Sequence, residues 1–328
     1  MSQFLSKCTA TKMFDAAANL LAGNLVAFPT ETVYGLGADA CNADAVARIY
    51  SVKGRPADHP LIVHVASMEG LGDWAADVPA YAISLARDFW PGPMTLVVRR
   101  SELAADFVTG GQDTVGVRVP NHPVALGLLE AFARAGGRGV AAPSANRFGN
   151  VSPTTAQAVA DELSDYLGDA DQILDGGPCE VGVESTIINC TGEVPSILRP
   201  GAVTVAMIEE STGLVVGDSA VVTGESVDEK EIRVSGSLDS HYAPVATVVL
   251  DQSPVSGQGF IAIADVATPD GVVRLAAPKS DDEFARVLYS ALRSADELGL
   301  ETVVVQMPTG NGIAIAIRDR LIRASNGR

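Results

Sequence analysis

Four cationic side chains stand beside short apolar runs in the first two thirds of the chain. They are Lys53, Arg55, Arg118 and Arg199. Guanidinium groups bind carboxylates and phosphates through paired hydrogen bonds, and a lysine ammonium binds phosphate oxygens as a point charge. A triphosphate together with a small carboxylate would use all four cations. Taken singly, each arginine could instead be solvated at the surface or paired with an acid such as Asp58.

Neutral hydrogen-bonding side chains accompany these cations. Ser144, Asn146, Ser185 and Thr186 follow or begin strand-like segments. Loop residues at strand ends in α/β domains are held in fixed geometry, so such clusters predict one convergent site. The sequence contains no Walker A motif, no GxSxG elbow and no defensible Ser-His-Asp order. This favours catalysis by positioning and charge neutralisation over covalent catalysis.

Three further polar residues allow two interpretations each. His64 lies inside an apolar run, where a structural histidine is more common than a ligand-binding one. Thr32 could be a turn residue, and Glu31 could be a general base or could cap the following turn. The residue types alone leave these alternatives open.

The segments that would position these groups alternate between helical and strand-like patterns, which is typical of an α/β protein. Helices are predicted over residues 11–24, 42–54, 123–135, 152–163, 281–298 and 312–325. Strands are predicted over residues 25–30, 60–66, 94–100, 114–119, 139–146, 172–178, 185–190 and 196–203, and later over 246–251, 260–265, 272–278 and 302–308. Capping-box spacing joins Thr154 to Gln157 and Ser280 to Glu283, which predicts where two of the helices begin.

The 328 residues, of which 47% are hydrophobic, predict two domains. We expect a first domain over residues 1–205 and a small Rossmann-like α/β domain over 245–328. Residues 206–244 lack a sustained period and are expected to form a linker. The second domain has no GxGxxG fingerprint after its first strand, so a dinucleotide-binding role is unsupported.

Composition and charge disfavour several classes of function. A net charge of -17 disfavours a dedicated nucleic-acid binder, although a local cleft could still concentrate cations. Neither a signal peptide nor an apolar run of 18 residues is present, so we expect a cytoplasmic protein without a membrane span. The cysteines are scattered, which disfavours disulfides and a protein-built metal site. They are Cys8, Cys41, Cys179 and Cys190.

A series of motifs, all in family order, resembles the threonylcarbamoyl-AMP synthase family in its long, two-domain form. The motifs are "FPTETVYGLGADA", "KGRP" before "PLIVHV", "PGPMTLVV", "VGVRVPNHP", "APSANRFGNVSPT", "GVESTIIN", "ILRPGAV" and "HYAP". They cover residues 25–205 densely, and "ARVLYSALRSADELGL" with "IAIAIRDRLIRAS" resembles the second domain of the long form. The resemblance implies a YrdC-like twisted-sheet domain with a concave site, a long linker and a small Rossmann-like domain.

The resemblance also implies a reaction. L-threonine, bicarbonate and ATP, with Mg²⁺ bridging phosphates, would give threonylcarbamoyl-adenylate and pyrophosphate. The product would supply the threonylcarbamoyl group for the adenosine next to the anticodon of ANN-decoding tRNAs. An aromatic content of 5% offers no evident platform for stacking tRNA bases. We therefore expect weak or absent direct tRNA binding, with transfer performed by a downstream threonylcarbamoyl-transferase complex.

Residue roles follow from the same resemblance, whose Lys-x-Arg and Ser-x-Asn signature is present here. The ATP-binding residues would be Lys53, Arg55, His59, Thr114, Ser144, Asn146, Ser152, Arg199 and Tyr242, with Lys53 and Arg55 also catalytic. The threonine-binding residues would be Thr32, His64, Arg118, Ala142 and Ser185.

Two of these assignments have particular features. His59 stands where the family's run is expected to carry asparagine, and its titration could make nucleotide binding pH-dependent. Tyr242 belongs to the "HYAP" motif of the linker, which would fold over the site and bring the tyrosine to the nucleotide. Alternatively, "HYAP" is only a proline-terminated entry to the second domain.

Two other functions are weighed against this one. Carbamoyl transfer in hydrogenase maturation would require acylphosphatase and zinc-finger modules, and neither fits this sequence. An RNA-binding or ribosome-assembly module would show no threonine-dependent turnover, and its RNA affinity would fall steeply with salt.

Overall fold

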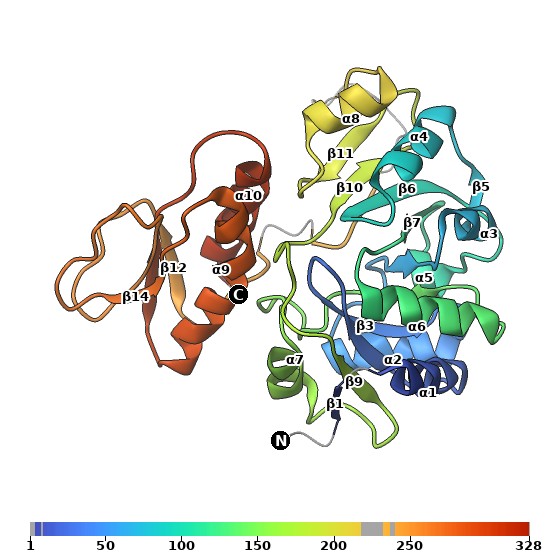
Figure 1. Cartoon of the computed structure of the whole chain (residues 1–328), viewed down its shortest axis with the longest axis horizontal. Coiled ribbons are helices and arrows are strands. Elements are labelled where there is room, and N and C mark those ends of the chain that lie inside the picture. Colours follow the sequence, from blue (N-terminus) through green and yellow to red (C-terminus); the bar gives the residue numbers. More distant parts are fainter. Residues whose placement is uncertain (1–3, 8, 218–231, 237–239, 328) are drawn as a thin grey trace.

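A computed structural model gives the fold and describes residues 4–7, 9–217, 232–236 and 240–327. Within these residues the strands form two separate sheets, one of eleven strands and one of four. Figure 1 shows the large sheet and its helices on one side and the smaller sheet with α9 and α10 on the other. The predicted α/β fold class with a second domain is confirmed.

The large sheet is twisted and mixes parallel with antiparallel pairs. Its strands are β1 (Leu5–Lys7), β2 (Val26–Pro29), β3 (Tyr34–Asp39), β4 (Ile62–His64), β5 (Ala75–Asp77), β6 (Met94–Arg100), β7 (Thr114–Arg118), β8 (Val140–Ala141), β9 (Gln172–Asp175), β10 (Thr186–Asn189) and β11 (Ser196–Arg199). Their order is β1-β9-β2-β3-β8-β4-β7-β6-β10-β11, with β5 paired to β6. Distant segments thus become neighbours, as where His64 of β4 pairs with Arg118 of β7.

Helices cover both faces of this sheet. They are α1 (Ala10–Leu21), α2 (Ala43–Lys53), η1 (Met68–Gly70), α3 (Leu71–Trp74), α4 (Ala80–Phe89), α5 (Asp106–Thr109), α6 (Pro123–Arg134), α7 (Ala156–Leu163) and α8 (Val205–Thr212). Strand β2 shows the two layers, because Val26 and Phe28 pack with α1 and α6 while Ala27 belongs to the core with α2 and α7. A strand buried on both faces reads as a continuous apolar run, as this one does.

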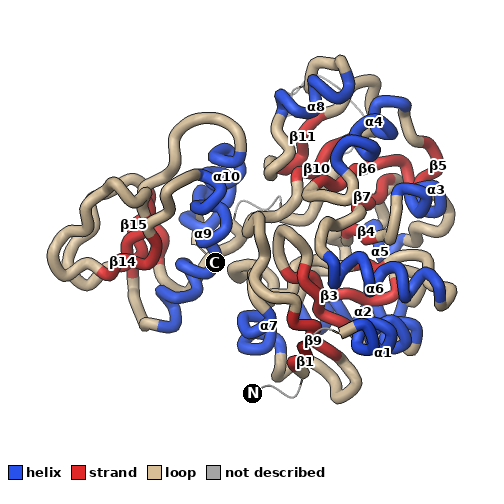
Figure 2. The backbone as a smooth tube through the Cα atoms, in the orientation of Figure 1, coloured by secondary structure: helices blue, strands red, loops and turns tan. Residues whose placement is uncertain are grey.

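The smaller sheet is entirely parallel and has the order β12-β15-β13-β14. Its strands are β12 (Thr247–Leu250), β13 (Gly259–Ile261), β14 (Val273–Ala276) and β15 (Thr302–Val305). Its helices α9 (Asp281–Glu297) and α10 (Ile313–Ser325) stand between this sheet and the large domain in Figure 2. Buried side chains of both helices share one apolar cluster with Val33, Val151 and Val183 of the first domain.

Most predicted elements are confirmed to within a few residues, and β6 has the predicted bounds. Ser280 caps α9 as predicted, since its hydroxyl accepts from the Glu283 amide at 3.2 Å. The predicted capping box at Thr154 is wrong by one position, because Thr155 is the residue whose hydroxyl accepts from the Ala158 amide. The sequence patterns did not predict β1, β3, β5, η1, α3, α4, α5 or α8.

Helix α8 lies at the start of the range 206–244 that was expected to be a linker. Residues 218–231 and 237–239 of that range lie outside the described residues, and the expected domain boundaries stay predictions. Cys41, Cys179 and Cys190 are free thiols, while Cys8 lies outside the described residues. Among the described helices, none is long and apolar enough to cross a bilayer.

Gly182 is a close contact point between the domains. Its φ of +84° lies in the left-handed region, and a Cβ at this position would stand 2.4 Å from the Ala285 carbonyl oxygen of α9. Gly177 has a similar φ of +86°, but a Cβ there would meet nothing within 4 Å. A substitution at Gly177 therefore measures the backbone strain alone, whereas one at Gly182 also measures the overlap with α9.

We expect Gly182→Ala to lower the free energy of unfolding by about 2 kcal/mol or more, because strain and overlap with α9 add together. Gly177→Ala should lower it by only about 1 kcal/mol, the effect of the backbone conformation alone. Urea unfolding of both variants measures the difference. Equal losses would mean that α9 moves away without penalty.

Candidate functional site

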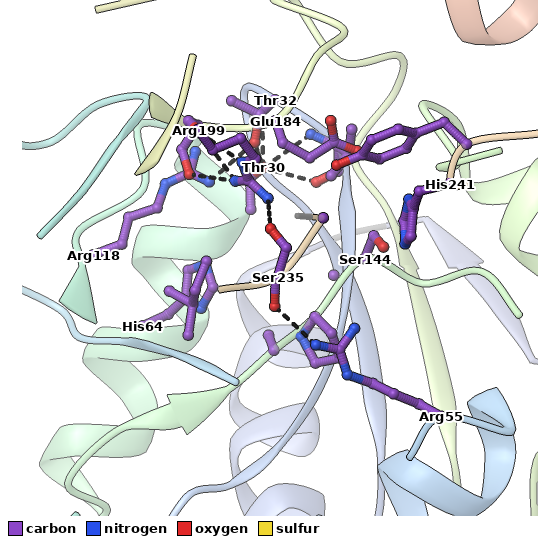
Figure 3. A pocket seen from close by; sticks show the side chains of 18 residues that line it. Thr30, Thr32, Arg55, His64, Arg118, Ser144, Glu184, Arg199, Ser235 and His241 are labelled. Carbon is purple, nitrogen blue, oxygen red and sulfur yellow. Dashed lines mark hydrogen bonds between the residues drawn. The ribbon is translucent and has the colours of Figure 1, made fainter. Parts of the chain in front are cut away.

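A pocket with about 530 Å³ of open space lies where several strands of the large sheet begin or end. Thr32 precedes β3, His64 ends β4 and Arg199 ends β11. Figure 3 shows their side chains facing the same space. Nine of the predicted site residues line the pocket: Thr32, Arg55, His64, Arg118, Ala142, Ser144, Ser185, Arg199 and Tyr242.

Five predicted site residues are not among those that line this pocket, namely Lys53, His59, Thr114, Asn146 and Ser152. Thr114 lines a neighbouring hollow, which shares Ile62 and Ser235 with the main pocket. The His59 ring lies edge-on to Phe148, with ring centroids 5.4 Å apart. The structure thus places His59 and Thr114 around the pocket rather than at its wall.

Lys53 is buried and its ammonium faces the loop that carries the predicted Ser-x-Asn residues. Its Nζ donates to the Ser144 carbonyl oxygen at 2.6 Å and to the Asn146 carbonyl oxygen. Burial, with the nearby charge of Arg55, lowers the pKa of Lys53 well below its usual range. In this structure Lys53 therefore holds the Ser144–Asn146 loop beside the pocket.

At the end of α2 the side chains of Lys53 and Arg55 point to different parts of the protein. Gly54 follows the helix with a φ of +61°, so the chain turns between the two cations. Arg55 enters the pocket, and its Nη2 donates to the Pro60 carbonyl oxygen and to the Ser235 hydroxyl, both at 3.1 Å. Burial lowers the pKa of Arg55 to about 10, which leaves the guanidinium charged at neutral pH.

Arg118 has a carboxylate partner inside the protein. Its Nη2 lies 2.5 Å from Oε1 of Glu31, and its Nη1 donates to the Thr32 hydroxyl at 3.0 Å. The other Glu31 oxygen accepts from the Asn121 amide at 2.9 Å. Glu31 is thus held as the counter-ion of Arg118, a role different from both sequence interpretations, the general base and the cap of the following turn.

Arg199 is buried and lies along the Ser185 segment. Its Nη2 donates to the Ser185 carbonyl oxygen at 2.9 Å and to the Ser185 hydroxyl at 3.1 Å. Its Nη1 donates to the Ser235 carbonyl oxygen at 2.7 Å. Burial lowers the pKa of Arg199 from its ordinary value. The hydrogen bonds of the Arg199 guanidinium to Ser185 and Ser235 are thus accepted by oxygens of neutral groups and not by carboxylates.

Residues of the expected linker close one side of the pocket. Ser235 lies between Arg55 and Arg199 in Figure 3, and Gly236, His241 and Tyr242 also line the wall. Tyr242 is buried and its ring stacks on Tyr289 of α9 at 5.7 Å. These contacts place the "HYAP" motif at the pocket.

Several buried polar atoms around the pocket have no hydrogen-bond partner within the described part of the chain. They are Arg55 Nε, His64 Nδ1, Asn146 Oδ1, His241 Nδ1 and the Tyr242 hydroxyl. Buried polar groups are normally paired, so a cluster of unpaired ones indicates a place where a ligand or water completes the hydrogen bonding. The described residues contain no group of three or more His, Cys, Asp or Glu side chains arranged to hold a metal ion.

Part of the pocket wall consists of residues that the sequence patterns did not single out. Thr30, Val33, Gly35, Pro143, Glu184 and His241 all lie within or beside quoted motifs, so proximity to a motif was an available signal. Ile62 was hidden in an apolar strand. Ser235 and Gly236 belong to a segment without a period, and no pattern pointed to them.

Two family models match the chain. The model described as telomere recombination, for Sua5, YciO and YrdC proteins, matches residues 18–201. A second model, described as the C-terminal domain of threonylcarbamoyl-AMP synthase, matches residues 203–326.

Relatives and solved structures agree with these models over nearly the full chain. A Pyrococcus abyssi protein named threonylcarbamoyl-AMP synthase is 41% identical, covering 95% of this chain and 94% of its own length. A Bacillus subtilis protein of the same name is 40% identical, covering 95% and 92%. The crystal structure of Pyrococcus abyssi Sua5 complexed with L-threonine superposes with a TM-score of 0.85 at 39% identity, covering 98% of this chain and 96% of that one.

The histidines of the pocket predict a pH-dependent stability. Burial, with the charge of Arg118, lowers the pKa of His64 to about 3, and burial also lowers that of His241 to about 3. An unfolded histidine has a pKa of about 6.5. Between these values the unfolded chain binds more protons, so stability falls as the pH decreases from about 6.5 towards about 3.

We expect His64→Gln to remove about 2 kcal/mol of the stability difference between pH 7 and pH 5, which is the linkage contribution of one such histidine. Urea unfolding at the two pH values measures it. His59→Gln is the control, because His59 is less buried and should change the pH dependence less. Identical pH dependence in wild type and His64→Gln would show that His64 does not stay neutral.

Proposed function

The chain belongs to the threonylcarbamoyl-AMP synthase family, and we infer that it forms L-threonylcarbamoyl-adenylate from L-threonine, bicarbonate and ATP, releasing pyrophosphate. Matches to both domains and about 40% identity over 95% of the chain support this activity. The adenylate serves the threonylcarbamoyladenosine modification of tRNA.

One observation about the pocket fits this chemistry best. Arg55 and Arg199 are buried guanidinium groups that face the same space, and neither forms an ion pair within the described residues. A buried cation without an ion-pair partner is unfavourable unless an anion shares its environment. The Glu184 carboxylate lies near Arg199 but already forms its ion pair with Arg320. Two such cations predict an anionic ligand with several oxygens, and the phosphates of ATP fit that description.

We propose the predicted division of the pocket between the two substrates. Arg55, Arg199, Ser144 and Tyr242 would lie against the nucleotide, while Lys53 would act through the loop whose carbonyl oxygens it binds. Asn146, Ser152, His59 and Thr114 would complete the surroundings of the nucleotide. The threonine would be surrounded by Thr32, His64, Arg118, Ala142 and Ser185. Threonine is also the ligand of the Pyrococcus abyssi Sua5 complex.

The reaction joins two anions, a carbamate and a triphosphate, so the protein must reduce the repulsion between them. The amine of threonine condenses with bicarbonate, which loses water and becomes the carboxylate of a carbamate. An oxygen of this carboxylate then attacks the α-phosphorus, and the bond to the β-phosphate breaks as pyrophosphate leaves. Fixed guanidinium groups reduce the repulsion between the carbamate and the triphosphate and stabilise charge on the leaving pyrophosphate. Burial of His64 keeps its imidazole neutral, so it offers the amino acid a hydrogen bond without a second positive charge.

We propose that Mg²⁺ enters with ATP, carried by the phosphates. The carboxylates nearest the pocket are already engaged, Glu31 by Arg118 and Glu184 by Arg320. The donors of the pocket are cations and hydroxyl groups, which suit phosphate oxygens. Bound Mg²⁺ would add neutralisation of phosphate charge.

The fate of the product is a further part of the proposal. We place the enzyme in the cytoplasm and expect it to pass the labile adenylate to a threonylcarbamoyl-transferase complex. The net charge of -17 supports weak or absent direct binding to tRNA.

Pyrophosphate release tests the activity directly. With ATP, bicarbonate and Mg²⁺, we expect release that depends on L-threonine and is at least about tenfold slower with L-serine, since loss of a methyl contact and its packing weakens binding. If folded protein released no pyrophosphate in response to threonine, the RNA-binding or ribosome-assembly alternative would be favoured. Measuring the affinity for RNA at several salt concentrations would then test that alternative.

Arg55 tests the nucleotide half of the pocket. Arg55→Gln should raise the KM for ATP about tenfold or more, because it removes a buried charge that faces the phosphates. Arg138→Gln is the matched control, since Arg138 forms an exposed ion pair with Asp73 at 3.0 Å. Initial rates against ATP concentration measure both, and an unchanged KM in Arg55→Gln would remove Arg55 from the nucleotide site.

A further inference from the structure

Glu184 carries a buried carboxylate at the junction between the pocket and the second domain. It lines the pocket and directly precedes Ser185. Its Oε1 accepts from the Ser152 hydroxyl at 2.6 Å, and its Oε2 accepts from the Tyr289 hydroxyl at 2.8 Å and from Arg320 Nε at 2.9 Å. Tyr289 belongs to α9 and Arg320 to α10, so the second domain provides two of the three donors.

Arg320 also reaches a second segment of the pocket. Its Nη2 donates to the Pro200 carbonyl oxygen at 3.0 Å, and Pro200 directly follows Arg199. One fully buried guanidinium of α10 therefore binds the segment that precedes Ser185 and the segment that follows Arg199. These two segments lead into and out of the antiparallel pair β10 and β11.

Ser185 and Arg199 depend on each other's placement inside the pocket. The Arg199 guanidinium donates to the carbonyl and hydroxyl oxygens of Ser185 at 2.9 and 3.1 Å. A small displacement of either segment would break these bonds, because hydrogen bonds weaken steeply with distance and angle. Arg320 thus contacts Glu184 and Pro200, which are the sequence neighbours of Ser185 and Arg199.

Electrostatics fixes the Glu184 carboxylate in its charged form. Burial by itself would raise its pKa, but Arg320, Arg199 and the Ser152 hydroxyl outweigh burial and lower the pKa to about 2. A buried carboxylate that loses one of its partners is strongly destabilised and moves towards other donors or water. Removing a donor of the second domain would therefore shift Glu184 and, with it, the adjoining Ser185.

We propose that Tyr289 and Arg320 of the second domain are positioning residues for the substrate pocket, acting through Glu184 and Pro200 to place Ser185 and Arg199. This inference rests on the proposed function of the pocket in binding L-threonine and ATP. It gives the second domain a role in substrate affinity that does not require any of its side chains to touch a substrate.

Tyr289→Phe and Arg320→Lys test this coupling. The first removes only the hydroxyl that donates to Glu184 and keeps the aromatic ring against Tyr242. The second keeps a positive charge and loses the guanidinium fork that binds Glu184 and Pro200 together. The matched control is Arg286→Gln on the same helix as Tyr289, because exposed Arg286 donates across the interface to the Glu180 carbonyl oxygen at 2.9 Å, away from Glu184.

Calorimetric titration with L-threonine and threonine-dependent pyrophosphate release are measured for the parent and for these three variants. The titration is also measured for Glu184→Gln, alone and combined with Tyr289→Phe. We expect the Kd and KM for L-threonine to rise about fivefold in Tyr289→Phe and about tenfold in Arg320→Lys, with kcat changed less, as for couplings between neighbouring sites. In Arg286→Gln these values should stay within about twofold of the parent. Glu184→Gln combined with Tyr289→Phe should raise the Kd no further than Glu184→Gln alone.

The outcomes separate the two proposals. A folded parent without threonine-dependent pyrophosphate release would overturn the proposed function itself. An active parent whose Tyr289→Phe variant binds L-threonine within twofold, with an unchanged thermal midpoint, would overturn the positioning role. An equal rise in all three variants would also overturn it, because general loosening of the interface would then explain the loss.

Discussion

The burial of positive charge is the constraint around which this protein is built. Three guanidinium groups and one ammonium lie at or beside a single pocket, in a chain whose net charge is -17. Each of these cations is held by a particular set of oxygens. Arg118 takes the carboxylate of Glu31, whereas Lys53 takes two backbone carbonyl oxygens. Because carbonyl oxygens neutralise a charge only partly, Arg55 and Arg199 keep positive charge that an anionic ligand can share.

Much of the architecture serves to bring those oxygens to the cations. The strand order places β4 beside β7, so His64 and Arg118 come from distant parts of the sequence to adjacent positions. The left-handed Gly54 turns the chain so that Lys53 and Arg55 face different surroundings. Ser235, which lies in the range expected to form a linker, adds a hydroxyl oxygen that accepts from Arg55 and a carbonyl oxygen that accepts from Arg199. The site is therefore assembled from rigid strand ends on one side and from a chain segment near the second domain on the other.

The sequence predicted the fold well where local patterns decide the structure. Apolar runs located strands such as β6, and the Ser280 and Glu283 pair located the start of α9, because periodicity and capping act over a few residues. Polar side chains at strand ends predicted five of the pocket residues, and the family resemblance implied four more. The first five are Arg55, Arg118, Ser144, Ser185 and Arg199, and the other four are Thr32, His64, Ala142 and Tyr242. The orientation of Lys53 could not be foreseen, because a motif does not tell whether an ammonium faces a ligand or a backbone loop. The two partners of Glu184 in the second domain lie 105 and 136 residues away in sequence, so only the tertiary structure brings them together.

The contact of Arg320 with Glu184 and Pro200 has a thermodynamic consequence for the whole molecule. Coupling between two binding events is reciprocal, so any factor by which domain docking tightens substrate binding is also the factor by which substrate tightens docking. Substrate binding in the pocket and docking of the second domain are then thermodynamically coupled. Substrate concentration would set how firmly the second domain is held, and heat or denaturant would separate the domains of the free enzyme before those of the loaded one.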